Sequence, residues 1–284
     1  MNKKTILNTA LVCGAAACFS LQSCQNTQTA KPAKVSSIQA DTLVALKDGD
    51  KASPKCKVSI DYMYLEPGDE KDSISAIINS KIQNIAFGDA YDSMQPREAI
   101  SSLVNKYASE YKNDLIKFYE ADLHNGMKAE DIPSWYNYEY EITSELSLNN
   151  DSIWNFSVTE FRYTGGAHPN TNIKWANLLA ESGKVLTKDV VFRKDKEKEI
   201  VGLIMKHLID EVNQRLETDT ITSIEGLKEN GALLDVDLYI PDNFLLLEDR
   251  VSFLYNRYDI APYSMGEFII DVPYAEIETM LNRE

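Results

Sequence analysis

The sequence predicts an α+β fold, in which antiparallel sheets pack against helices in two interlocked subdomains. Apolar and polar residues alternate along several segments, as in half-buried strands, and apolar residues recur at helical spacing along three others. Strand and helix patterns do not alternate regularly, which argues against a parallel α/β sheet. The 284 residues suffice for one or two domains with a sizeable core.

The first half of the chain is expected to contain a strand, two helices and a hairpin. Residues 57–65 alternate and are followed by Pro67 and Gly68, so they predict a strand. Apolar side chains lie on one stripe along residues 72–86 and along a longer segment that begins at Pro96. Proline is favoured in the first turn of a helix, so the second helix is expected to begin there.

The hairpin gives the clearest strand pattern. Apolar and tyrosine side chains occupy even positions along residues 136–148, and the NND sequence at 149–151 predicts a turn, because Asn and Asp tolerate positive φ. The return strand keeps the even phase as far as Val158 and then changes to Phe161 and Tyr163. We therefore expect a β-bulge near residues 159–160, which would redirect the end of the strand.

The second half is expected to mix the same kinds of element. The expected elements are a third strand at 172–178, a short helical or turn segment at 188–192, a long helix at 197–216, a hairpin of 243–247 with 251–255, a strand at 267–272 and a closing helix at 274–281. The loop 258–266 leads into the last strand.

The first 24 residues have the pattern of a secretory signal. Lys3 and Lys4 precede an apolar run at 10–21, which is too short to span a membrane. The LQSC sequence that ends at Cys24 resembles the lipobox of bacterial lipoproteins, which implies cleavage before Cys24 and lipidation of its thiol. Gln25 follows Cys24, and in the Gram-negative sorting rule this favours the outer membrane. An ordinary secretory signal is the alternative.

Residues 25–54 are rich in polar and small residues and predict a flexible tether, with a short strand possible at 42–46.

Charge and cysteine content restrict the possible partners. The formal net charge is −15, and loss of Lys3 and Lys4 with the leader would make it more negative still. Such a surface disfavours nucleic acid and can attract a cationic partner. Once the leader is removed and Cys24 is lipidated, only Cys56 remains, so neither an internal disulfide nor a cysteine-based zinc site is expected.

The sequence contains none of the common catalytic motifs, and we expect no catalytic residues, metal or cofactor. His207 lies within the predicted long helix, and His124 follows a predicted helix end. His168 alone lies in a turn-like context, in RYTGGAHPN at 162–170. Glu139 and Glu141 share one face of a strand, where a pair of carboxylates could serve a glycosidase, but their alternation with tyrosines favours a solvated face.

Two motifs resemble one known family arrangement. YTGGAHPN at 163–170 resembles the motif of the PdaC/SigV-like extracytoplasmic domain, and FLYNRYDIAPYSMGEFIIDVPYAEI at 253–277 resembles the end of its RsiV-like companion, a domain of unknown function. The resemblance covers about residues 55–284 and implies a PdaC/SigV-like subdomain at 55–180 and an RsiV-like subdomain at 181–284. These follow the signal peptide expected at 1–24 and the tether expected at 25–54.

The resemblance implies a binding role near the cell wall. The family occurs in an anti-sigma factor whose outer domain binds lysozyme and at the N-terminus of a peptidoglycan deacetylase. Neither a cytoplasmic segment nor a deacetylase domain is expected here. We therefore expect a non-enzymatic, lipid-anchored module of the cell envelope that binds a cationic lysozyme-like muramidase or peptidoglycan glycan. An enzyme acting on envelope glycans and a structural envelope protein are the alternatives.

Two loops are the candidate ligand-contact sites. The expected contact residues are Tyr163, Gly165, Gly166, His168 and Asn170 in the first loop, and Tyr258 and Tyr263 in the second.

Overall fold

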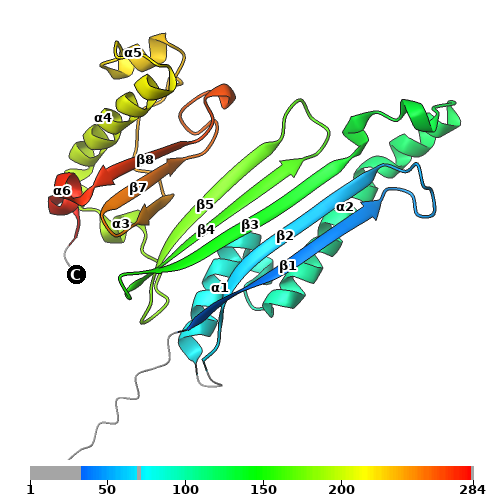
Figure 1. Ribbon diagram of the computed structural model, residues 1–284, viewed down its shortest axis with the longest axis horizontal. Helices are drawn as coiled ribbons and strands as arrows, with labels where there is room; N and C mark the ends of the chain where they lie inside the picture. Colours follow the sequence, from blue (N-terminus) through cyan, green and yellow to red (C-terminus); the bar gives the residue numbers. More distant parts are fainter. Residues whose placement is uncertain (1–32, 69–71, 283–284) are drawn as a thin grey trace, which may run out of the picture. The chain divides into compact units, whose positions relative to one another are not determined.

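The computed structural model describes residues 33–68 and 72–282, and its helices and sheets confirm the predicted α+β class. One subdomain is built on a five-stranded sheet and the other on a three-stranded sheet (Figure 1). Each sheet has its own cluster of buried side chains, which span Ile38 to Leu178 in the first and Leu186 to Ile277 in the second. The leader and Cys24 lie outside the described residues.

The five-stranded sheet follows chain order. Its strands are β1 (Lys34–Ala45), β2 (Lys55–Glu66), β3 (Tyr138–Asn149), β4 (Ile153–Tyr163) and β5 (Asn170–Leu179). Neighbouring strands run antiparallel except β2 and β3, which pair in parallel. The two helices between β2 and β3 carry the chain back to the end of the sheet at which β2 begins, so β3 runs parallel to β2. This sheet is therefore mixed rather than wholly antiparallel.

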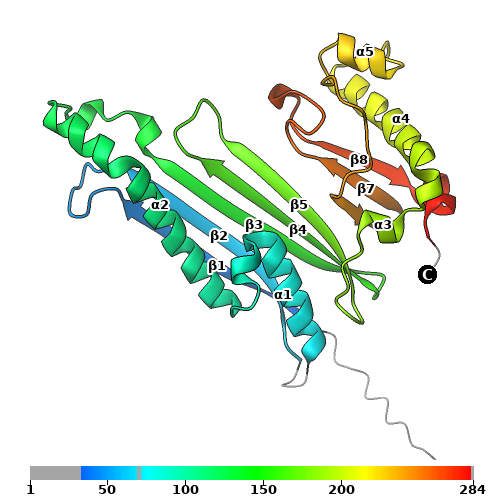
Figure 2. The same ribbon diagram turned by 180° about the vertical axis from the view of Figure 1, so that it is seen from behind.

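Helices α1 (Ser73–Phe87) and α2 (Pro96–His124) cover one face of this sheet (Figures 1 and 2). Asp72 caps α1 by accepting from the backbone N–H of Ser75 at 3.0 Å. Hydrogen bonds from the backbone N–H groups of Gly68 and Ser75 lower the pKa of its carboxyl. As predicted, α2 begins at Pro96. Short 3-10 turns occupy Asp89–Tyr91, Ala129–Asp131 and Ser134–Tyr136 along this crossover.

The tyrosines that alternate along β3 form the contact with α2. The rings of Tyr107 and Tyr140 stack with their centroids 4.1 Å apart, and those of Tyr111 and Tyr138 lie 5.2 Å apart. Cys56 is fully buried on the same side of the sheet, and burial raises the pKa of its thiol to about 12. This thiol is therefore protonated at neutral pH and packs as a small apolar group.

The predicted tether is wrong for much of its length. Residues 34–45 form β1, which pairs with β2 along its whole length and buries Ile38. Only one face of this edge strand contacts the helices, and the polar residues Ser37, Gln39 and Asp41 lie on the opposite, exposed face. A short turn, in which Leu46 donates to the carbonyl of Pro54 at 2.9 Å, connects β1 to β2.

The predicted turn between β3 and β4 is confirmed, but the bulge predicted near residues 159–160 is wrong, because β4 pairs regularly there. Asn150 and Asp151 adopt φ values of 48° and 54° in the tight turn. The pairing of β3 with β4 then continues without an inserted residue from Asn149↔Ile153 to Glu139↔Tyr163. The apolar phase changes because the helix-facing positions at this end are polar: Tyr107 donates to the carboxylate of Glu160 at 3.3 Å, and Arg162 lies over the ring of Tyr140.

The second subdomain is a small antiparallel sheet packed against one long helix. Its elements are α3 (Lys188–Val191), α4 (Glu197–Arg215), α5 (Ile224–Glu229), β6 (Phe244–Leu246), β7 (Arg250–Tyr255), β8 (Phe268–Pro273) and α6 (Tyr274–Ile277), with 3-10 turns at Lys194–Lys196, Tyr263–Met265 and Glu278–Met280. The strands follow the order β6-β7-β8. Helix α4 packs on β8 through buried residues at helical spacing, Ile200, Ile204, Leu208 and Val212.

Asparagine side chains join the two sheets edge to edge. Asn177 donates to the carbonyl of Phe244 at 2.9 Å and accepts from the N–H of Leu246 at 2.8 Å, and Asn149 and Asn155 donate to the carbonyl of Leu246. The side chains therefore satisfy backbone groups at the free edge of β6.

Asparagines of the second subdomain bind the backbone of β5 in return. Asn256 accepts from the N–H of Ile173 at 2.8 Å and donates to its carbonyl at 3.0 Å, and Asn243 binds the N–H of Trp175 and the carbonyl of Ile173. An amide side chain carries both a donor and an acceptor, so one residue can satisfy both backbone groups of an edge residue. We call this set of asparagines (149, 155, 177, 243 and 256) the asparagine ladder.

Within the described part of the chain, no helix combines the length and the apolar character needed to cross a membrane.

We expect a chain that begins at residue 50 to be less stable than one that begins at residue 33. The shorter chain lacks β1, so it loses the burial of Ile38 and exposes the edge of β2. Burial of one isoleucine contributes about 2 kcal/mol, so the free energy of unfolding should fall by at least that amount. Urea unfolding measures the difference, and equal midpoints would show that β1 contributes nothing.

We expect Asn177→Leu to lower the free energy of unfolding by about 3 kcal/mol. The side chain of Asn177 is buried, and its loss leaves backbone groups of Phe244 and Leu246 without partners in the interior. The matched control is Asn113→Leu on the exposed side of α2, which should change stability by less than about 0.5 kcal/mol. Similar effects of the two substitutions in thermal unfolding would contradict the ladder's role.

Candidate functional site

The loop 164–169 connects β4 to β5 and lies against both subdomains. On the side of the first subdomain, Gly165 has a φ of 81°, and a Cβ atom added to it would lie 2.5 Å from the carbonyl oxygen of Trp135. The position therefore requires glycine both for its left-handed backbone and for the close approach. Gly166 has neither constraint: its φ is not in the left-handed region, and its nearest neighbour is the carbonyl oxygen of His168 at 3.8 Å.

On the other side, the same loop meets the second candidate loop. The imidazole of His168 stacks on the ring of Tyr263, with the centroids 3.9 Å apart and the planes inclined by 22°. The hydroxyl of Tyr263 donates to the carbonyl of Pro169 at 3.0 Å, and the hydroxyl of Tyr258 lies 3.5 Å from Nε2 of His168. The structure therefore brings together two loops that lie about 90 residues apart in the sequence.

Arg257 completes this group of side chains. Its guanidinium lies over the ring of Tyr263, 4.7 Å from the centroid, and its Nη1 donates to the hydroxyl of Tyr263 at 2.9 Å. An ion pair of 3.2 Å between its Nε and the carboxylate of Glu267 holds the guanidinium in place. We call His168, Arg257, Tyr258 and Tyr263 the His168 cluster.

The cluster presents aromatic surface to solvent. Tyr258 is 55% exposed and adopts a left-handed backbone with a φ of 69°. Trp135, which touches the loop at Gly165, is 38% exposed and stacks on Tyr136. Exposed aromatic rings on either side of one loop suit contact with the apolar face of a sugar or with a protein surface.

The remaining predicted residues take other positions. Tyr163 ends β4 opposite Glu139, and Asn170 begins β5 opposite Arg162. No hydrogen bond or ring contact joins Tyr163 or Asn170 to the cluster within the described chain. Cys24, the predicted lipidation site, lies outside the described residues.

The other candidates for chemistry have structural partners. Lys57 pairs with the carboxylates of Glu139 and Glu141 at 2.8 and 2.6 Å on the face of the sheet away from the helices. His207 on α4 lies 3.3 Å from the carboxylate of Glu276, and His124 ends α2. In the described residues, no group of three or more His, Cys, Asp or Glu side chains is arranged to hold a metal ion.

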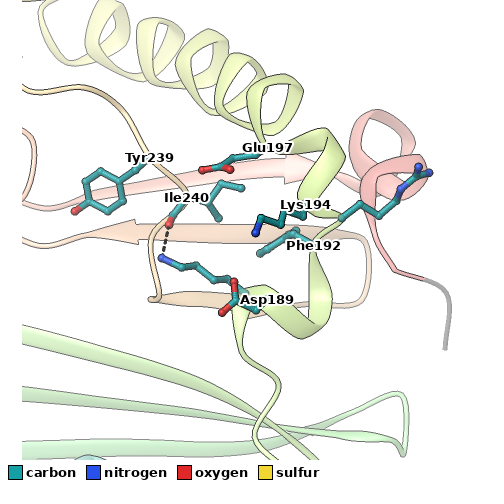
Figure 3. A pocket seen from close by; sticks show the side chains of 8 residues that line it. Asp189, Phe192, Lys194, Glu197, Tyr239 and Ile240 are labelled. Atoms are coloured by element: carbon teal, nitrogen blue, oxygen red, sulfur yellow. Dashed lines mark hydrogen bonds between the residues drawn. The ribbon is translucent and has the colours of Figure 1, made fainter.

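A pocket of about 410 Å³ in the second subdomain was not predicted from the sequence. Phe192 and Ile240 form its apolar floor, and Tyr239 lies across from Lys194 and Glu197 (Figure 3). Burial and the nearby Asp259 and Asp242 raise the pKa of Tyr239. The dense run of mixed charge at 193–199 is the one sequence signal for this site, but the residues that face it at 239–240 are far away in the chain.

Comparison with family models gives two matches, one for each subdomain. Residues 51–171 match the model of the deacetylase PdaC, and residues 188–275 match the model of a protein of unknown function, DUF3298. No curated protein matches the chain.

Two solved structures are similar over most of the chain. The crystal structure of a DUF3298 family member from Bacteroides fragilis NCTC 9343 is 28% identical, with a TM-score of 0.78, and the match covers 89% of this chain and 95% of that one. A DUF3298 family protein from Pseudomonas aeruginosa PAO1 is 13% identical, with a TM-score of 0.56 and coverage of 89% and 96%, which shows a shared fold.

We expect Gly165→Ala to destabilise the protein and Gly166→Ala to leave it almost unchanged. The first substitution places a Cβ against the carbonyl of Trp135 and strains a left-handed backbone, which costs about 1–3 kcal/mol. The second places its Cβ at an ordinary contact distance. Urea unfolding of the pair measures the difference. Equal stability of the two variants would show that the loop does not require glycine at residue 165.

Proposed function

We propose that this chain, in which a PdaC-like domain precedes a DUF3298 domain, is a non-enzymatic binding protein of the cell envelope. A lipid on Cys24 would hold it at the membrane, and Gln25 favours the outer membrane of a Gram-negative bacterium. The observation that carries the proposal is the convergence of two loops, one from each subdomain, in the exposed His168 cluster. The asparagine ladder connects the two subdomains, and a surface that is already ordered loses less conformational entropy when a partner binds.

The surroundings of His168 favour binding over catalysis. Among the described residues, its ring nitrogens lie near the carbonyl oxygen of Pro169, at 3.2 Å, and the hydroxyl of Tyr258. A histidine that acts as a general base normally forms a hydrogen bond with the nucleophile that it activates, and no Ser, Thr or Cys side chain of the described residues forms one with His168. Here the imidazole instead packs flat on Tyr263. This arrangement holds the loop in position and suits a recognition surface.

The preferred ligand is a cationic protein of the lysozyme type. The net charge of −15 gives a field that attracts such a protein from a distance, while the exposed aromatic rings supply contact area after encounter. Because long-range attraction is screened by salt, binding should be strongest at low ionic strength.

Peptidoglycan glycan is the second candidate. Trp135 lies beside Gly165 and Tyr258 lies beside His168, and both are partly exposed, so they could stack on successive sugars. This ligand is uncharged over most of its glycan chain, so its binding should depend weakly on salt.

We expect Tyr258→Ser to weaken binding of the full chain to lysozyme by about tenfold, because an exposed aromatic side chain at an interface commonly contributes more than 1 kcal/mol. Titration calorimetry at low salt measures the affinity, which should fall further as salt is raised. The control is Tyr239→Ser, which removes an exposed tyrosine from the separate pocket and should leave binding unchanged.

Sedimentation with isolated peptidoglycan provides the second arm. Retention by peptidoglycan, lost in Tyr258→Ser and insensitive to salt, would select the glycan. Absence of binding to both lysozyme and peptidoglycan would rule out the proposed function.

A further inference from the structure

The pocket beside α4 contains charged side chains that the protein itself does not neutralise. Lys188 has partners within the protein, because its Nζ lies 3.1 Å from the carboxylate of Asp242 and donates to the carbonyl of Ile240. Arg193 pairs with Asp195 at 2.7 Å. Asp189, Lys194 and Glu197, in contrast, form no hydrogen bond or ion pair with any described residue, although all three line the pocket.

The unpaired groups surround a pocket whose floor is apolar. In Figure 3, Glu197 and Lys194 lie along one side of the hollow, Asp189 lies near its lower edge, and Tyr239 and Ile240 face them. The core holds the floor of the pocket in place, because Phe192 is buried and its ring packs against those of Phe244 and Phe253. Tyr239 packs edge-on against Tyr255, whose hydroxyl donates to the carbonyl of Tyr239.

We propose that this pocket binds a free basic amino acid of the lysine type. The two unpaired carboxylates of Asp189 and Glu197 match two ammonium groups, and the ammonium of Lys194 matches one carboxylate. The aliphatic chain between the ligand's charges lies on Phe192, Ile240 and Tyr239. The volume of about 410 Å³ is within the range of small-molecule sites.

This inference goes beyond the proposed function, because the pocket shares no residue with the His168 cluster. The groups at its rim are exposed, so each ion pair with the ligand contributes modestly. Weak but charge-specific binding is therefore the expected behaviour. Specificity comes from the arrangement of three charges around one apolar floor.

The test is a titration of the isotope-labelled full chain with L-lysine, followed by amide NMR shifts. Lysine should shift the resonances of Tyr239, Ile240 and Glu197. Norleucine lacks the second ammonium group and cadaverine lacks the carboxylate, so each should bind about threefold or more weakly than lysine.

Substitutions of the pocket residues show which charged group of the ligand each side chain contacts. In Lys194→Met, cadaverine and lysine should bind equally, because the partner of the carboxylate is gone. Asp189→Asn and Glu197→Gln should each weaken lysine binding, but only one of the two should weaken norleucine binding. The matched control is Lys198→Met, which changes an exposed lysine on α4 that does not line the pocket, and this variant should bind lysine normally.

Two results would overturn the proposal. One is the absence of shifts at the pocket with millimolar lysine. The other is equal binding of lysine, norleucine and cadaverine, which would indicate a non-specific apolar site. All four substitutions change exposed side chains, so an unchanged amide spectrum without ligand verifies that each variant is folded. Lysozyme and peptidoglycan binding should be unaffected in Lys194→Met, which separates this test from that of the proposed function.

Discussion

The contact on which the rest of the structure depends is the asparagine ladder between β5 and β6. Each sheet has an edge whose backbone groups face the other sheet, and amide side chains satisfy those groups at distances of 2.8 to 3.1 Å. Because the asparagines stand between the two backbones, the sheets are joined without merging into one. A chain with two separate hydrophobic cores thereby gains a specific connection between them.

The ladder also positions the His168 cluster. Asn256 binds Ile173 near the start of β5, and it immediately precedes Arg257 and Tyr258. The first loop enters β5 just before this point, so His168 and Tyr263 come within stacking distance. Gly165 fixes the other side of the same loop against Trp135. The candidate recognition surface is thus a consequence of how the two sheet edges are joined.

Sequence reasoning succeeded where a single periodicity decided the outcome. The stripe of apolar residues gave α4, and the alternating tyrosines gave β3, because each faces one partner along its whole length. It failed where a strand faces two environments. The helix-facing positions at the end of β4 bind polar partners, so Phe161 lies on the other face although the strand has no bulge. The apolar residues of β1 fall on both faces of the strand, so they show no regular alternation that would distinguish it from a tether.

The sequence by itself determined the fold class, most of the elements and the two loops worth attention, because local periodicity and turn residues carry that information. Only the tertiary structure decided that His168 meets Tyr258 and Tyr263, and that Lys194 and Glu197 face Tyr239 across a pocket. These contacts join residues about 40 to 90 positions apart, and their geometry follows from the packing of strands and helices, which no local pattern encodes.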